Sequence, residues 1–107
     1  MLWKPNVYVD TSAMALIYPP AKLARVLEDW LIQFPEKVLF GTDAAAFGPD
    51  SGWDLAAWIG TTTARRALGI ALTNMMRDGS VSRPRAEEIA TMVMRTNAAK
   101  LYDLRLP

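Results

Sequence analysis

Histidine and cysteine are both absent from this chain, and their absence excludes several classes of chemistry. Without cysteine there are no disulfides, no thiol nucleophiles and no thiolate metal sites. Without histidine a Ser-His-Asp triad cannot form, and zinc sites in proteins normally use nitrogen or sulfur ligands. Any metal site that this chain builds by itself must therefore consist of carboxylates.

Strong net charge and long apolar runs are lacking as well. The 107 residues carry a formal net charge of +1, too small for the basic footprint of a nucleic-acid-binding protein. No apolar run approaches the roughly 18 residues that cross a bilayer. The N-terminal residues do not have the pattern of a secretory signal. We therefore expect a cytoplasmic protein that binds neither nucleic acid nor a membrane.

The charges that are present are unevenly distributed along the chain. Residues 1–63 carry four basic and seven acidic side chains, a net charge of −3. Residues 64–107 carry eight basic and four acidic side chains, a net charge of +4. Such halves attract each other or their neighbours. The hydrophobic share of 51% is that of a globular protein, and the length allows one small domain.

The first half of the chain predicts a strand, a helix and a second strand. Residues 6–12 are β-branched and aromatic and predict a strand. Residues 22–34 predict a helix that ends before Pro35. Its apolar stripe consists of Leu23, Val26, Leu27, Trp30, Leu31 and Phe34. Residues 37–43 have a continuously apolar centre, which is typical of a strand covered on both faces of a parallel sheet.

The second half of the chain predicts a long loop followed by helices. Gly, Pro, Asp and aromatic residues fill residues 44–60, which predict a loop that could contain one helical turn around 53–58. Helices are expected at residues 63–78 and 84–104. Strands that alternate with helices indicate an α/β fold with parallel strands. Because two strands are marginal alone and both edges would be unpaired, residues 1–107 are interpreted as one module of a larger sheet.

Asp43 stands at the end of the second predicted strand and is the main candidate for a functional residue. In α/β architectures, sites assemble at the carboxyl ends of the strands. The same position also suits an aspartate that only forms a turn or caps a helix. Asp10 and Ser12, near the end of the first strand, could face the same site, but a turn or cap role fits them better.

Three segments resemble the end of an amidohydrolase-related TIM barrel. They are NVYVDTS at residues 6–12, EKVLFGTD at 36–43 and NAAKLY at 97–102, and the resemblance extends over residues 6–104. It implies that the first two segments are barrel strands seven and eight and that the third closes the last helix. The expected fold is the C-terminal part of a (β/α)8 TIM barrel, with two parallel strands and three to four helices. Met1 would then fall between helix six and strand seven.

The resemblance implies that Asp43 is the strand-eight aspartate, which binds or adjoins a divalent metal and takes a proton from the attacking water. A metal lowers the pKa of bound water toward 7, and a nearby base completes this chemistry. The family's other ligands for this metal, expected to be zinc, are histidines on earlier strands. This chain has none, so we expect it to hold no cofactor and to be inactive alone. The expected partner is the missing N-terminal barrel portion or a second copy of the chain.

Aromatic and basic side chains of the loop and the following helix are further candidates. Phe47 and Trp53, with Trp58, could line a substrate pocket, or they could plug the core, and the sequence favours neither alternative. Arg65 and Arg66 could bind a substrate anion near a helix N-terminus, although solvated charge is the better interpretation.

Three functions remain open at this point. The first is an incomplete metal-dependent hydrolase that is active only within a full barrel. The second is a self-associating interaction module that reuses the same surface. The third is a carboxylate-based Mg²⁺ or Mn²⁺ enzyme built on Asp43 with Asp10, Asp50 or Asp54, although one well-placed carboxylate does not make a metal cage. Relatives of such barrels hydrolyse amides, esters or lactones or decarboxylate aromatic acids, so the substrate is not determined.

Overall fold

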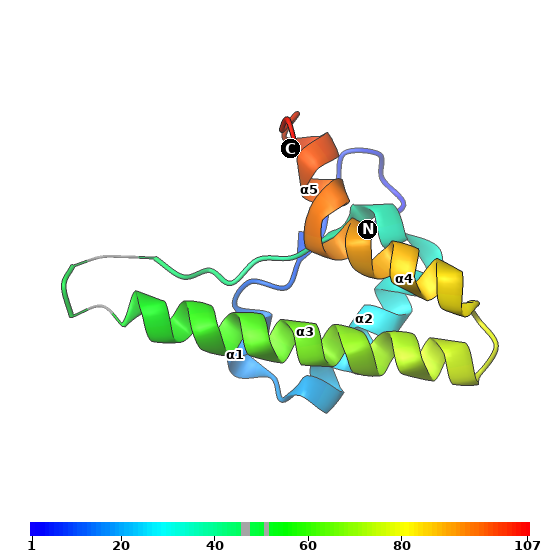
Figure 1. Cartoon of the computed structure of the whole chain (residues 1–107), viewed down its shortest axis with the longest axis horizontal. Coiled ribbons are helices and arrows are strands. Elements are labelled where there is room, and N and C mark those ends of the chain that lie inside the picture. The colour runs from blue at the N-terminus through cyan, green and yellow to red at the C-terminus, as the bar shows by residue number, and fades with distance from the viewer. Residues whose placement is uncertain (46–47, 51) are drawn as a thin grey trace.

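The computed structural model describes residues 1–45, 48–50 and 52–107 and has extents of 47 × 31 × 30 Å. Two short parallel strands lie among helices, so the chain is α/β. The elements in order are β1 (Val9–Asp10), α1 (Met14–Ile17), α2 (Pro20–Gln33), a 3-10 turn (Pro35–Lys37), β2 (Val38–Leu39), α3 (Trp53–Arg77), α4 (Arg83–Thr91), a π-helical turn (Met92–Thr96) and α5 (Asn97–Leu101). Figure 1 shows α3 running the length of the molecule, with α2 crossing it.

The sheet consists of β1 and β2, paired in parallel with Val9 opposite Val38 and Asp10 opposite Leu39. This confirms the parallel pairing expected from the sequence, with α1 and α2 in the crossover. Each strand is only two residues long, so the predicted strand lengths are wrong. The chain before β1 is folded into turns, and the 3-10 turn occupies the start of the second predicted strand.

Helix α2 follows the predicted apolar stripe closely. Pro20 occupies its first turn, where the missing N–H of proline costs nothing, and the helix ends just before Pro35. Leu23, Leu27 and Leu31 are buried against α3, each with at most 1% of its surface exposed. Burying each of these side chains stabilises the fold by about 1.5–3 kcal/mol.

Helix α3 begins at Trp53, ten residues before the start expected from the sequence. The predicted loop 44–60 is therefore too long, and the predicted helix 63–78 is too short. The first turns of α3 expose their large side chains, and Gly60 and three threonines of low helix propensity separate them from the buried stripe of the later turns. The later turns of α3 do face the core, and their buried residues include Ala64, Leu68, Ala71, Leu72 and Met75.

The expected helix 84–104 is a nearly continuous helical segment from α4 through the π-helical turn to α5, ending at Leu101. The hydroxyl of Ser82 accepts a hydrogen bond from the backbone N–H of Arg85 at 3.3 Å, so Ser82 is the N-cap of α4. None of the helices in the part of the chain that the structure describes combines the length and apolarity of a membrane span.

The outer edge of β2 is covered by this helical segment. The buried side-chain amide of Asn97 donates to the carbonyl oxygens of Pro35 and Val38, at 2.7 and 2.8 Å. Farther along the edge, the backbone N–H of Phe40 donates to the carbonyl oxygen of Val93 at 3.0 Å. The expectation that both sheet edges are unpaired is therefore wrong for β2, because helix groups take the place of a neighbouring strand.

The Asn97 side chain gives a direct test of this edge. Asn97→Ala leaves two buried carbonyl oxygens without their donor, so we expect the free energy of unfolding to fall by about 2–3 kcal/mol. Urea denaturation followed by circular dichroism measures the change. The control is Asn6→Ala, at an exposed position in a turn, where we expect less than about 0.5 kcal/mol. Equal effects of both variants would show that the amide of Asn97 does not hold β2.

Candidate functional site

The carboxyl ends of β1 and β2 are joined by Thr11. Its backbone N–H donates to the carbonyl oxygen of Leu39 at 3.2 Å, which extends the ladder by one bond. Its hydroxyl donates to the carbonyl oxygen of Gly41 at 2.9 Å and accepts from the N–H of Gly41 at 3.2 Å. The segment that follows β2 is therefore held beside the end of β1. Sequence reasoning treated Thr11 only as part of a strand and missed this role.

Two glycines allow the backbone to approach closely around this segment. A Cβ atom on Gly41 would lie 2.7 Å from the hydroxyl oxygen of Ser12 and 3.6 Å from the carboxyl carbon of Asp10. A Cβ atom on Gly60 of α3 would lie 3.2 Å from the Cβ of Thr42. Gly41 and Thr42 are thus packed between the end of β1 and the first third of α3.

Asp43 follows this packed segment and is exposed. Its φ of 56° is in the left-handed region, which aspartate and asparagine tolerate better than most residues. The hydroxyl of Thr42 accepts a hydrogen bond from the N–H of Ala44 at 3.3 Å and closes the turn around Asp43. Asp43 therefore lies on the chain leaving β2, past the carboxyl end of that strand, with its carboxylate available to solvent.

Asp10 is engaged locally. Its carboxylate oxygen accepts a hydrogen bond from the N–H of Ser12 at 3.1 Å, so the turn interpretation of Asp10 is confirmed. Asp50 lies in an exposed turn, and Asp54 is exposed in the first turn of α3, where a negative charge suits the helix dipole. Within residues 1–45, 48–50 and 52–107, no three His, Cys, Asp or Glu side chains come together to hold a metal ion. The donors of the described chain do not fit a metal by themselves.

The aromatic candidates lie away from the core. Trp53 is 50% exposed and Trp58 is 67% exposed, so neither plugs the interior of this chain. Trp53 precedes Gly60 by seven residues of α3, which places it about 10 Å along the helix axis from the contact with Thr42. Phe47 lies outside the described residues. Arg65 is exposed in the middle of α3 and not at its start, which favours the solvated interpretation.

A sequence model of the amidohydrolase family, described as Amidohydrolase, matches residues 1–104 of this chain. The chain belongs to the amidohydrolase family. The match covers β1, β2 and all the helices named above, and it confirms the family resemblance seen in the sequence. Neither the curated proteins nor the solved structures contain a significant match to this amidohydrolase-family chain.

The different surroundings of Gly41 and Gly69 predict opposite effects of a glycine-to-alanine change on stability. Gly41→Ala places a methyl group against Ser12, so we expect the free energy of unfolding to fall by about 1–3 kcal/mol. Gly69→Ala, within α3, meets nothing within 4 Å and should raise stability by about 0.5–1 kcal/mol through helix propensity. Thermal and urea unfolding of the two variants measure whether the free energy of unfolding falls or rises in each. A stabilising Gly41→Ala would show that the two strand ends are not closely packed.

Proposed function

We propose that this chain is the C-terminal segment of a metal-dependent, amidohydrolase-type hydrolase barrel and that it contributes Asp43 to the active site. The observation that carries the proposal is the family match over residues 1–104, taken together with the parallel pairing of β1 and β2. In barrels of parallel strands the active site lies at the carboxyl ends of the strands. Asp43 is the carboxylate that follows the second of these strands.

The proposed role of Asp43 is that of a general base. An exposed carboxylate on a turn beyond the strand can accept a proton from a water held above the sheet. The metal would be zinc or another divalent ion, and its remaining ligands would be histidines outside this chain, which contains no histidine. On this proposal the isolated chain binds no metal tightly and has no hydrolase activity. The complementary N-terminal barrel portion is its partner.

Reconstitution with a partner segment tests this function. The chain is combined with the strands one to six portion of a related amidohydrolase, and metal-dependent hydrolysis of amide, ester and lactone substrates is measured. Asp43→Asn keeps the turn but removes the base, so we expect kcat to fall by about 10²- to 10⁴-fold. The matched control is Asp103→Asn, because Asp103 is also exposed and has a similar φ of 52°. The control should keep its activity within about twofold.

Two results would contradict the proposal. Hydrolase activity that is equal in the Asp43→Asn and wild-type mixtures would show that Asp43 does not act in the active site. Submicromolar zinc binding by the isolated chain would show that the metal site does not need histidines from elsewhere.

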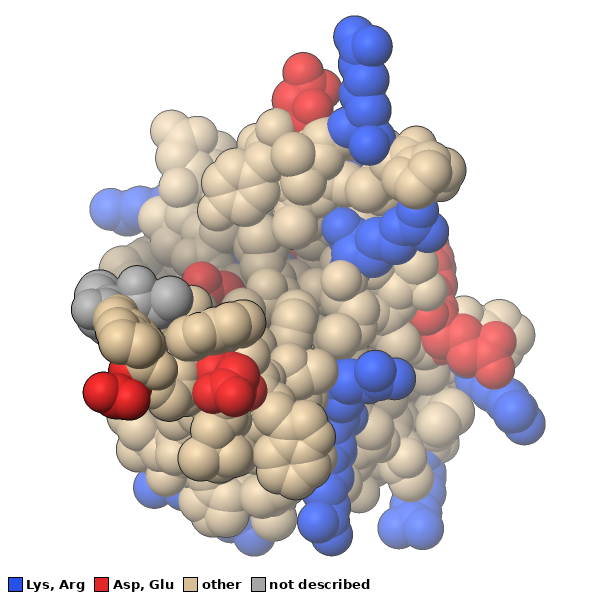
Figure 2. All heavy atoms as spheres, turned by 60° about the vertical axis from the view of Figure 1, so that its left-hand side comes forward, with Lys and Arg blue, Asp and Glu red and all other residues tan. Residues whose placement is uncertain are grey.

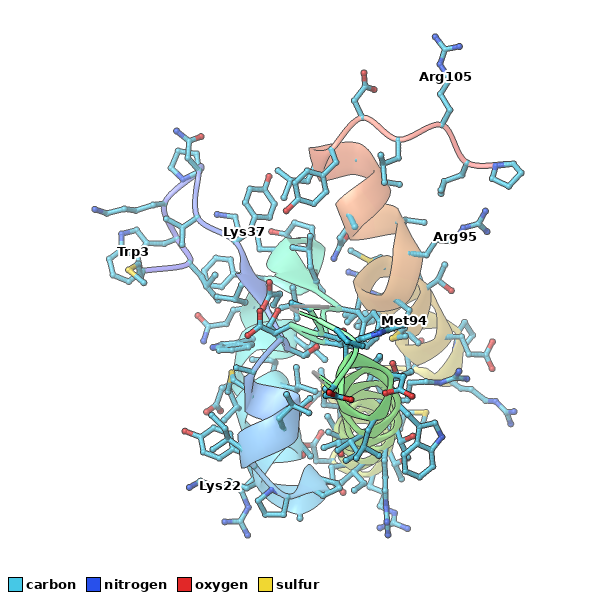
Figure 3. The ribbon with its side chains drawn as sticks, turned by 90° about the vertical axis from the view of Figure 1, so that its left-hand side faces the viewer. Trp3, Lys22, Lys37, Met94, Arg95 and Arg105 are labelled. Atoms are coloured by element: carbon cyan, nitrogen blue, oxygen red, sulfur yellow. The ribbon has the colours of Figure 1, made fainter. Side chains whose placement is uncertain are left out.

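A second candidate function is a self-associating interaction module, and exposed apolar side chains favour it. On the first turns of α3, Leu55, Trp58 and Ile59 are 59%, 67% and 38% exposed and have the spacing of one helix face. Figure 2, in which this end of the molecule is turned forward, shows a broad uncharged surface with acidic side chains beside it. Trp3 is 72% exposed, and Figure 3 shows it pointing away from the body on the N-terminal loop. Exposed apolar patches of this kind mark interaction sites.

This candidate predicts that the 11.9 kDa chain associates with a second copy through α3. Trp58→Gln removes the largest side chain of the patch, so we expect the dimer dissociation constant to rise by about tenfold or more. Sedimentation equilibrium over a wide concentration range measures it. Ile17→Gln is the control, because Ile17 is 71% exposed on α1 and should change association little. If the chain is a monomer at every concentration up to high micromolar, the function of a self-associating interaction module is excluded.

A further inference from the structure

Thr11 is a buried polar residue that no part of the general-base chemistry uses. Only 2% of its surface is exposed, although its side chain carries a hydroxyl. That hydroxyl makes both of its hydrogen bonds to the backbone of a single residue, Gly41, which is 30 residues away along the chain. Burying a hydroxyl is unfavourable unless it is hydrogen-bonded, so this position calls for a side chain with one donor and one acceptor.

The hydroxyl of Thr11 continues the sheet where the backbone ladder ends. The last backbone hydrogen bond between the two strand ends runs from the N–H of Thr11 to the carbonyl oxygen of Leu39. Two residues farther along, the N–H and the carbonyl of Gly41 are both paired with the Thr11 side chain. A single hydroxyl therefore does what the backbone of a further strand residue would do. Without it, two half-buried backbone groups would lose their partner.

Gly41 needs this restraint because glycine has more backbone freedom than any other residue. The next residue, Thr42, is packed against Gly60 of α3. Asp43 then adopts a left-handed conformation and is exposed. The direction in which the chain carries Asp43 away from the sheet is therefore fixed at the two preceding residues, first by hydrogen bonds and then by packing.

We propose that Thr11 is a positioning residue for Asp43, acting through its two hydrogen bonds to Gly41; this inference rests on the proposed function of Asp43. A general base must lie within hydrogen-bond reach of the water whose proton it takes, and a misplacement of about 1 Å can cost about 10²-fold in rate. Thr11 is buried, and its hydroxyl bonds only the backbone of Gly41. It holds the segment from which the base extends.

The first experiment uses the isolated chain and does not depend on activity. Thr11→Val keeps the shape of the side chain and removes the hydroxyl, whereas Thr11→Ser keeps the hydroxyl and removes the methyl group. We expect Thr11→Val to raise the hydrogen-exchange rate of the Gly41 amide by at least about tenfold. In the same variant, the three-bond amide to α-proton coupling of Asp43 should change, because φ is no longer held near 56°. Thr11→Ser should keep both wild-type values.

The second experiment measures kinetics in the reconstituted barrel. Thr11→Val should lower kcat by about 10- to 100-fold with KM unchanged, and Thr11→Ser should restore kcat to within about threefold of wild type. The matched control is Thr73→Val on α3, which also removes a hydroxyl that donates to a backbone carbonyl, that of Gly69 at 2.7 Å. This control should leave kcat unchanged, because α3 carries Thr73 on an exposed surface.

The outcomes separate this inference from the proposed function. If Thr11→Val leaves the exchange rate of Gly41 or the coupling of Asp43 unchanged, Thr11 does not position Asp43, whatever the activity. If both change but kcat and KM of the reconstituted enzyme stay at wild-type values, Thr11 is only structural, and the inference is overturned. If wild-type mixtures show no activity at all, the proposed function fails, while the measurements on the isolated chain still decide whether Thr11 fixes the turn.

Discussion

The structure depends on pairing the backbone polar groups of a very small parallel sheet. β1 and β2 are two residues each, and Val38 and Leu39 are buried, so a strand carbonyl or N–H left without a partner is costly. Different groups meet this constraint at different places. Beyond the last ladder bond between the strands, the hydroxyl of Thr11 pairs with the backbone of Gly41. On the outer edge of β2, Asn97 and Val93 pair with the backbone groups that point away from β1.

The same bonds bear on the proposed complete barrel. A strand that joined β2 on its outer edge would need the carbonyl of Val38 and the N–H of Phe40, which now bond to Asn97 and Val93. Closing the barrel would exchange these bonds for ladder bonds between strands, and the amide of Asn97 and the carbonyl of Val93 would then need other partners. Residues 92–96 form a π-helical turn, and such turns often occur at functional sites.

The N-terminal loop is attached to the same region by one side chain. The ammonium group of Lys37 donates to the carbonyl oxygens of Leu2 and Lys4, and Figure 3 shows Lys37 close to this loop. A cation that bonds two carbonyls fixes the loop beside the start of β2. One short stretch, residues 35–43, therefore organises the N-terminal loop, the C-terminal helical segment and the turn that carries Asp43.

The sequence by itself determined the family, the α/β class, helix α2 and the position of Asp43 after a strand, because these follow from local patterns of apolar residues and from three linked segments. It did not determine the start of α3 at Trp53, because Gly60 and three threonines, all of low helix propensity, separate these exposed turns from the buried stripe of the rest of α3. Only the tertiary structure decided the roles of Thr11 and Asn97. Their hydrogen bonds join positions 30 and 59 residues apart, and no local pattern predicts which backbone groups will meet.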